Sequence, residues 1–258
     1  MAIKRALLWL AAVALLLVSG TSIASWSVVG TSSSDTVAYS PNVTLGDFTV
    51  FYWYVTSSGQ SGATFNTMQP IIGTASPGGG QSFFLTRIYP TGGPSNAITI
   101  CEQTNGGAVD CSNSVDCRNA GTVCNVTPTW ANYALRRTGS SIHYFSGGFD
   151  AGSYTYNSTG IAWTIFQPEH GDSGSFNGQF ARIGVWNVAL SNNEINALAH
   201  CAPVPSVRAN HLVFYAPAYG YLTTDRDYSG RAAAGTLTST GTLKRMGDPP
   251  CGPDIPVN

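Results

Sequence analysis

Short strand-like segments recur along this chain about every dozen residues, with clusters of Gly, Pro, Ser and Asn between them. This spacing is typical of all-β sandwiches and barrels, in which tight turns join short strands. Helical periodicity occurs only once, near residues 192–200. The pattern therefore predicts an all-β fold with one short helix.

The segment Gly46 to Val55 carries apolar side chains at alternating positions on both faces of a strand. We expect it to be a central strand, because both of its faces would be buried. The turn Thr138-Gly139-Ser140 separates Ala131 to Arg137 from Ser141 to Phe145, and this arrangement predicts a hairpin. Later segments with strand-like patterning are Trp163 to Gln167, Gln179 to Trp186 and His211 to Ala216.

The single helix has its own start signal. Ser191 and Glu194 are spaced for a capping box, in which the serine hydroxyl accepts the N–H of Glu194 and the carboxylate accepts the N–H of Ser191. Leu190 and Ile195 are placed for a hydrophobic staple around this cap. We expect a short helix packed on a sheet, with a structural role.

The N-terminus reads as a targeting segment. Lys4 and Arg5 precede an uncharged apolar run, Ala6 to Val18, and Ser22-Ile23-Ala24 offers small residues for cleavage. An uncleaved membrane anchor is the alternative, although the run is short for a span, which needs about 20 apolar residues. We expect a signal peptide over residues 1–24, one sandwich domain over 25–246 and a proline-rich tail over 247–258.

The charge balance argues against nucleic acid as a partner. Loss of Lys4 and Arg5 with the signal lowers the number of basic residues from 12 to 10, against 13 acidic residues. Lys244 is then the only lysine, so no basic stripe is available for phosphates.

Six cysteines follow the predicted signal, and an even number in an exported chain predicts three disulfides. They are Cys101, Cys111, Cys117, Cys124, Cys201 and Cys251. The first four share one loop-like stretch and would staple it, whereas the last two would tie the C-terminal tail back. Zinc is the weaker alternative, since no pair has a two-residue gap and that stretch contains no histidine.

Several segments from Gly46 onward resemble the laminin G-like jelly-roll family. The sharpest match runs from Phe176 to Ser191 and ends in Glu194-Ile195, like the last core strand of that family and its short helix. Asp47 to Val50 and Trp130 to Ala134 resemble its opening strand and its middle hairpin. The resemblance implies an antiparallel jelly-roll β-sandwich of the concanavalin A-like kind. It implies a fold rather than a function, because lectins, adhesion modules, pentraxins and glucanases share this architecture.

The acidic residues do not form a recognisable catalytic pair. Glycoside hydrolysis needs two carboxylates flanking the scissile bond, and the only glutamates are Glu102, Glu169 and Glu194, none of them paired with an acid along a strand. Asp225 and Asp227 lie in a turn-like run, which favours a capped loop over a dyad. We therefore expect no enzyme; a divergent glycoside hydrolase is the alternative.

A metal hypothesis rests on Glu169 and Asp172. Calcium binds carboxylate and carbonyl oxygens on loops, and in the related pentraxins a Gln/Glu/Asp-rich segment at the corresponding place helps to bind it. Pro168 and His170 interrupt the pattern here. An ordinary polar loop is the alternative that these residues favour.

Aromatic residues near loops give a second hypothesis for a binding site. Sugar rings stack on aromatic faces, and four tyrosines at strand edges are the candidates: Tyr154, Tyr156, Tyr219 and Tyr221. Packing is the alternative for each of them. Together these features predict an exported, non-catalytic recognition module for carbohydrate or a glycosylated surface, with calcium as a candidate cofactor. A cell-surface or virion adhesion protein with protein partners is the competing hypothesis, and the sequence leaves the oligomeric state open.

Overall fold

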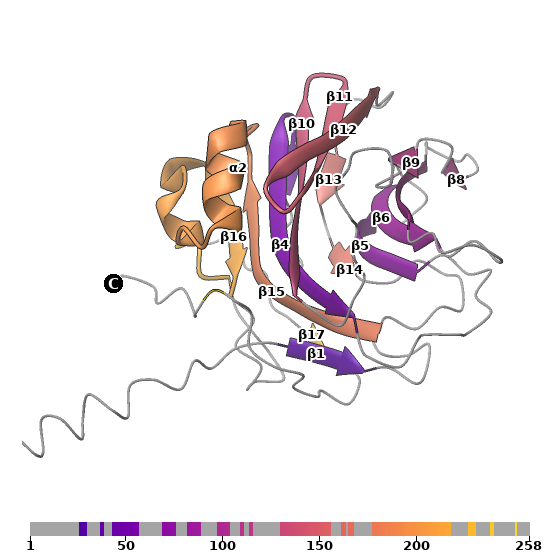
Figure 1. Ribbon diagram of the computed structural model, residues 1–258, viewed down its shortest axis with the longest axis horizontal. Coiled ribbons are helices and arrows are strands. Elements are labelled where there is room, and N and C mark those ends of the chain that lie inside the picture. Colours follow the sequence, from indigo (N-terminus) through magenta and orange to yellow (C-terminus); the bar gives the residue numbers. More distant parts are fainter. Residues whose placement is uncertain are drawn as a thin grey trace, which may run out of the picture.

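The computed structural model describes side chains over residues 46–53, 130–153, 155, 181–217, 227–230 and 251, and elsewhere only the backbone of the strands named below. Two antiparallel sheets form the body of the protein (Figure 1). No helix in these described parts of the chain combines the length and the apolar composition needed to cross a membrane.

The larger sheet has seven strands, ordered β1-β15-β4-β10-β11-β12, with β16 also paired to β15. Their bounds are β1 Trp26–Val29, β4 Phe48–Thr56, β10 Ala131–Thr138, β11 Ser141–Ser146, β12 Phe149–Thr155, β15 Asn177–Trp186 and β16 Leu212–Ala216. All of these pairings are antiparallel. The chain order around this sheet is that of a jelly roll, in which neighbouring strands come from distant segments.

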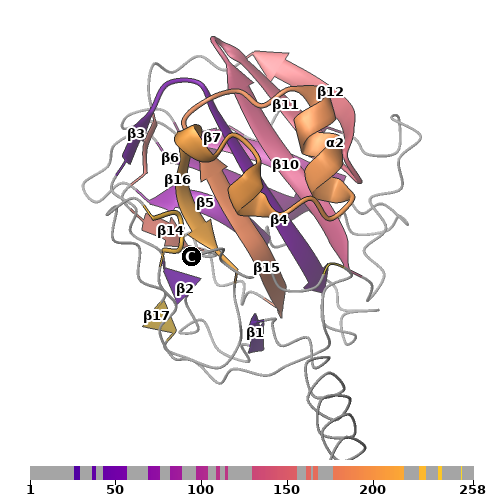
Figure 2. The same cartoon turned by 90° about the vertical axis from the view of Figure 1, so that its left-hand side faces the viewer.

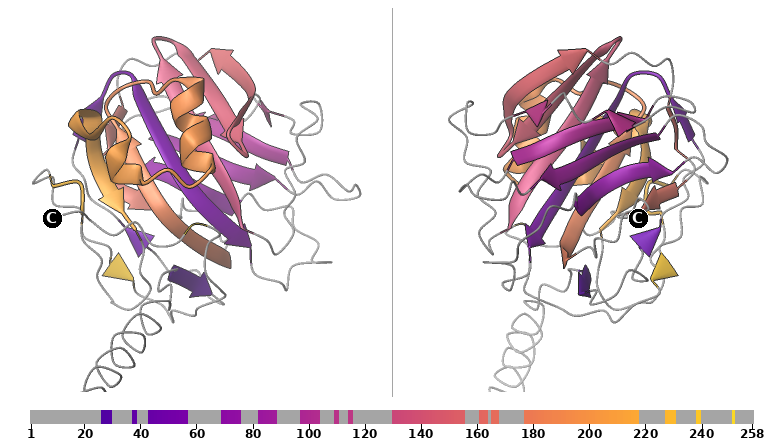
Figure 3. Two further views of the ribbon diagram at one scale, coloured as in Figure 1. Left: turned by 60° about the vertical axis from the view of Figure 1, so that its left-hand side comes forward. Right: turned by 90° about the vertical axis from the view of Figure 1, so that its right-hand side faces the viewer.

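The second sheet lies across from the first and completes the sandwich (Figure 3). Its strands are β5 Gln69–Ala75, β6 Ser82–Ile88, β7 Ala97–Gln103, β8 Val109–Asp110, β9 Ser114–Val115 and β14 Ile165–Gln167. Two further pairs of short strands lie outside these sheets. Strand β2, Val37–Ala38, pairs with β17, Thr238–Ser239, and strand β3, Val43–Leu45, pairs with β13, Ile161–Trp163. The predicted antiparallel jelly-roll β-sandwich with one short helix is confirmed.

Strand β4 is central, as its sequence predicts. It lies between β15 and β10. The side chains of Phe48, Thr49, Val50, Phe51 and Tyr52 are all fully buried, so both of its faces are covered. The strand begins two residues later than expected, because Gly46 and Asp47 form an exposed bend.

Helix α2, Asn192–Ala199, covers the outer face of this sheet, away from the second sheet (Figure 2). The capping box is confirmed: Glu194 N donates to Ser191 Oγ (3.3 Å), and Ser191 N donates to Glu194 Oε2 (2.8 Å). Leu190 and Ile195 are both buried in the core beneath the helix. The 3₁₀ turns η1 Val204–Ser206 and η2 Ala209–His211 lead from α2 to β16.

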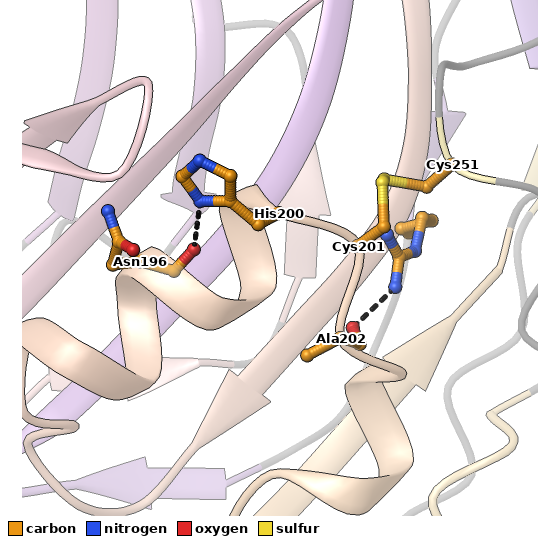
Figure 4. The surroundings of a disulfide bond; sticks show 6 residues. Asn196, His200, Cys201, Ala202 and Cys251 are labelled. Carbon is orange, nitrogen blue, oxygen red and sulfur yellow. Dashed lines mark hydrogen bonds between the residues drawn. A yellow bond between two sulfur atoms is a disulfide. The ribbon is translucent and has the colours of Figure 1, made fainter.

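The disulfide between Cys201 and Cys251 fastens the C-terminal segment beside the end of α2 (Figure 4). This is the pairing expected to tie the tail back. The buried Arg182 lies below it and donates from Nη2 to the carbonyl of Ala202 (2.6 Å). Cys251 is itself buried in the core cluster under α2, so the bond links the tail to the sheet.

Two predicted strands differ from the structure, and one strand was not predicted. The segment Trp163 to Gln167 is not continuous, because β13 ends at Trp163 and pairs with β3, whereas β14 starts at Ile165 and pairs with β5. His211 ends η2, so β16 begins one residue later. Strand β12 was not expected; Gly147 and Gly148, both with positive φ, form the turn that leads into it.

Candidate functional site

Most of the residues proposed from the sequence lie outside the described part of the chain. These are Tyr156, Tyr219, Tyr221, Glu169, Asp172, Cys111, Cys117 and Cys124. Tyr154 belongs to β12 and its backbone pairs with Ile142, and Cys101 belongs to β7; for both, only the backbone is described. The calcium, tyrosine and loop-disulfide hypotheses therefore stay predictions.

Asp227 is an exception, and its contacts decide between a catalytic and a structural role. Its carboxylate accepts hydrogen bonds from the backbone N–H groups of Tyr215 (2.9 Å) and Ser229 (2.8 Å) and from Ser229 Oγ (2.8 Å). Burial raises the pKa of Asp227, against the opposing effect of these bonds. The capped-loop interpretation is confirmed: the side chain attaches this loop to β16.

The best-defined polar cluster lies at the free edge of the larger sheet, on β10, β11 and β12. Arg136 and His143 are directly opposite each other on β10 and β11. His143 Nδ1 lies 2.8 Å from Asp150 Oδ2, and Arg136 Nη2 lies 3.8 Å from the same oxygen. About a quarter of each side chain in the His143–Asp150 pair is exposed, 27% and 26% respectively, so a ligand can reach both.

Arg136 connects this cluster to the segment that leads into α2. Its guanidinium donates to the carbonyl of Leu190 (3.1 Å) and to Asn192 Oδ1, which links β10 to the start of α2. The guanidinium carbon also lies 4.8 Å from the centre of the Phe145 ring, at cation–π distance. With Asp150 Oδ1 accepting from Gly152 N (3.1 Å), the carboxylate is fixed on both oxygens.

His143 is therefore oriented by Asp150, whose carboxylate is itself fixed by Arg136 and by the N–H of Gly152. Its Nδ1 is used in the contact with Asp150, so Nε2 is the ring nitrogen available to a ligand. With Nδ1 protonated, Nε2 accepts a hydrogen bond, for example from a hydroxyl group. The pair can thus recognise a polar group without further rearrangement.

Phe149 adds an apolar surface at the same edge. Its side chain is 61% exposed, which makes it the exposed large hydrophobic residue among those described. Its backbone pairs with Ser146 on β11. Asp150 is the next residue of β12, so the side chains of Phe149 and Asp150 lie on opposite faces of this strand. We call Arg136, His143, Phe149 and Asp150 the β12 edge surface.

The turn before β12 positions this surface. Gly148 has φ +84°, and a Cβ added there would lie 2.8 Å from Ala199 Cβ. Only glycine fits a turn pressed so closely against α2. The β11–β12 hairpin therefore docks on the last turn of the helix, which fixes Phe149 and Asp150 relative to the sheet.

The sequence carried part of the signal for this cluster. Ser146-Gly147-Gly148-Phe149 is a hairpin turn pattern that would have predicted β12. The meeting of His143 with Asp150 is harder to predict, because a register shift between Tyr144 and Phe145 intervenes in the pairing. Among the described residues, no group of three or more His, Cys, Asp and Glu side chains is placed to hold a metal ion.

No protein-family model and no curated protein sequence matches this chain. Among solved structures, it is similar to a "putative carbohydrate binding protein" from Bacteroides ovatus, with a TM-score of 0.59 and 16% identity over 88% of this chain. The chain spans 61% of the length of that protein. It is also similar to a heptameric SAP-like pentraxin from Limulus polyphemus, with a TM-score of 0.56 and 12% identity over 86% of this chain and 94% of the pentraxin. At these identities, the likeness establishes the fold.

Proposed function

We propose that this protein is an exported, non-catalytic recognition module that binds carbohydrate or a glycosylated surface. The observation that carries the proposal is the partly exposed His143–Asp150 pair, together with the exposed ring of Phe149 on the opposite face of the same edge strand. Saccharides present hydroxyl groups together with apolar C–H faces. A fixed polar pair and an exposed aromatic ring on the two faces of one edge strand together complement both.

The fold supports the same assignment. One structurally similar protein is described as a "putative carbohydrate binding protein", and its structure aligns with most of this chain. Fold likeness alone does not carry a function from one chain to another. The argument therefore rests on the β12 edge surface, and the fold adds support at the level of ligand class.

Export is supported by two features. The N-terminal segment has the pattern of a signal peptide. The disulfide between Cys201 and Cys251 belongs to the kind of bond that forms in oxidising compartments outside the cytosol. Together the two features support a secreted or cell-surface location.

Calcium is a separate part of the proposal. The laminin G-like resemblance and the acidic pair of Glu169 and Asp172 support a loop site for one ion. A thermal melt of the mature protein in calcium, and then in excess chelator, tests it, because an ion bound only by the folded state raises the melting temperature. The double variant E169Q/D172N should abolish any such rise; a rise that persists in the variant would place the ion elsewhere.

The ligand class is tested with a broad glycan array probed by the purified mature protein. Selective binding to a family of glycans is expected. The same array probed with the heat-denatured chain provides the control for nonspecific adhesion. Failure to bind any glycan above this control, with or without calcium, would overturn the proposal.

A further inference from the structure

Two buried polar atoms on the outer face of the larger sheet have no hydrogen-bond partner in the part of the chain that the structure describes. They are the indole Nε1 of Trp53 on β4 and the amide Oδ1 of Asn132 on β10. The two side chains are only 5% and 7% exposed. A buried polar group without a partner costs about 1–3 kcal/mol, so native structures rarely keep one empty.

The two atoms are complementary, and the residues that carry them are neighbours. Trp53 and Asn132 are directly opposite each other in the β4–β10 pairing, so their side chains are neighbours on one face. The indole N–H can only donate, and the amide oxygen can only accept. One hydroxyl group accepts from the first and donates to the second, and so satisfies both atoms at once.

The surroundings suit an alcohol carried on an apolar ring. Trp130, two residues before Asn132 and therefore on the same face, is partly buried against the core cluster that contains Trp53. On the other side of Asn132 lies Gly147, whose N–H donates to the Asn132 carbonyl (3.1 Å). A Cβ added at Gly147 would meet nothing within 4 Å, so this turn residue has open space around it.

We propose that Trp53 Nε1 and Asn132 Oδ1 form a binding position for one saccharide hydroxyl group, which becomes accessible when the side chain of Trp130 moves aside. That the ligand is a saccharide rests on the proposed function. That it contributes a hydroxyl group rests on the donor and the acceptor themselves. Both atoms are closed to solvent in the free chain. Binding therefore displaces the side chain of Trp130, which is the partly exposed member of this group.

The test follows the indole N–H signals of the ¹⁵N-labelled mature protein by NMR, with free glucose, galactose, mannose and N-acetylglucosamine as probes. Trp186 supplies an internal control, because its Nε1 already donates to the carbonyl of Val207 (2.7 Å). A saturable shift of the Trp53 signal with at least one sugar, without a shift of the Trp186 signal, is expected. The W53F variant assigns the Trp53 signal by its disappearance.

Two results would overturn the inference. One is a Trp53 signal that no sugar moves. The other is a cross-peak from Trp53 Nε1–H to a bound water that persists at saturating sugar, since a trapped water has the same hydrogen-bonding chemistry. For a sugar that binds, W53F should weaken affinity about tenfold, the equivalent of one lost hydrogen bond.

This experiment is independent of the β12 edge surface. Glycan binding that depends on Phe149 but leaves the Trp53 signal unmoved would remove the hydroxyl position and keep the proposed function. A Trp53 shift that survives F149A would keep the hydroxyl position and remove the edge surface as the binding site.

Discussion

At the scale of single residues, the polar side chains of this protein divide into those that hold the fold and those left for a ligand. Asp227 and Glu194 use their carboxylates on backbone groups and on neighbouring side chains. His143 retains one ring nitrogen that Asp150 does not use, and Trp53 retains an N–H with no partner among the described residues. The first pair should affect stability when changed, and the second pair should affect binding.

Replacing Asp227 with Ala should lower the free energy of unfolding by about 2 kcal/mol, because it removes the carboxylate that accepts from two partly buried backbone N–H groups. Urea denaturation measures the change. The variant S229A is the matched control, since it removes only the side-chain bond and should cost about 1 kcal/mol. Equal losses in the two variants would contradict the capping role.

Glu194 predicts a pH dependence of stability. Burial pushes the pKa of Glu194 up, but hydrogen bonds from Arg208 and Ser191 outweigh it and lower the pKa below its ordinary value of 4.5. A carboxyl group whose pKa is lower in the folded than in the unfolded protein stabilises the folded state. This stabilisation is complete at a pH above the pKa of the unfolded state, and it is lost as the pH falls through the pKa of the folded state. The free energy of unfolding, measured from pH 7 downward, should therefore fall less steeply below pH 4.5 in E194Q than in the wild type. Parallel curves would refute this assignment.

At the scale of elements, local sequence signals predicted two features that depend on neighbours along the chain. The capping box at Ser191 and the hairpin at Gly139 are set by residues within four positions of one another, and both are present. The break at Trp163 could not be predicted in this way, because it depends on which distant strands pair with each half. The meeting of His143 and Asp150 likewise depends on a shift in strand register.

The turn into β12 should tolerate no side chain at Gly148. G148A combines a positive φ with a contact of 2.8 Å to Ala199, and should destabilise the protein by about 2 kcal/mol or more. Gly147 is the matched control, because it also has positive φ but has open space around it. Chemical denaturation should show G147A to be the milder of the two changes; the reverse order would argue against close docking of the hairpin on α2.

At the scale of the whole molecule, the two-sheet architecture was predictable because alternation and turn residues repeat along the entire chain. The order of strands within each sheet was not, since it depends on long-range pairing. The resemblance to the laminin G-like family supplied the jelly-roll arrangement that periodicity alone lacks. The proposed binding surface needs both levels, because its residues come from three strands, β10, β11 and β12.

The disulfide acts at this scale, because it closes a segment of 50 residues between α2 and the C-terminal tail. The double variant C201S/C251S should lose about 3 kcal/mol of stability, since the unfolded chain regains the entropy of that loop. Thermal unfolding with and without reductant measures the loss. Addition of reductant to the double variant controls for the remaining cysteines, and an equal stability of wild type and variant without reductant would contradict the role of the bond.

The most direct test of carbohydrate recognition at the β12 edge surface is calorimetric titration of a glycan selected on the array into the wild type and into F149A, H143A and S140A. Ser140 is exposed in the turn at the opposite end of β11, so S140A should bind like the wild type. Loss of the aromatic ring or of the imidazole should weaken binding about tenfold each, with an unchanged melting temperature. Unchanged affinity in both F149A and H143A would contradict the central claim.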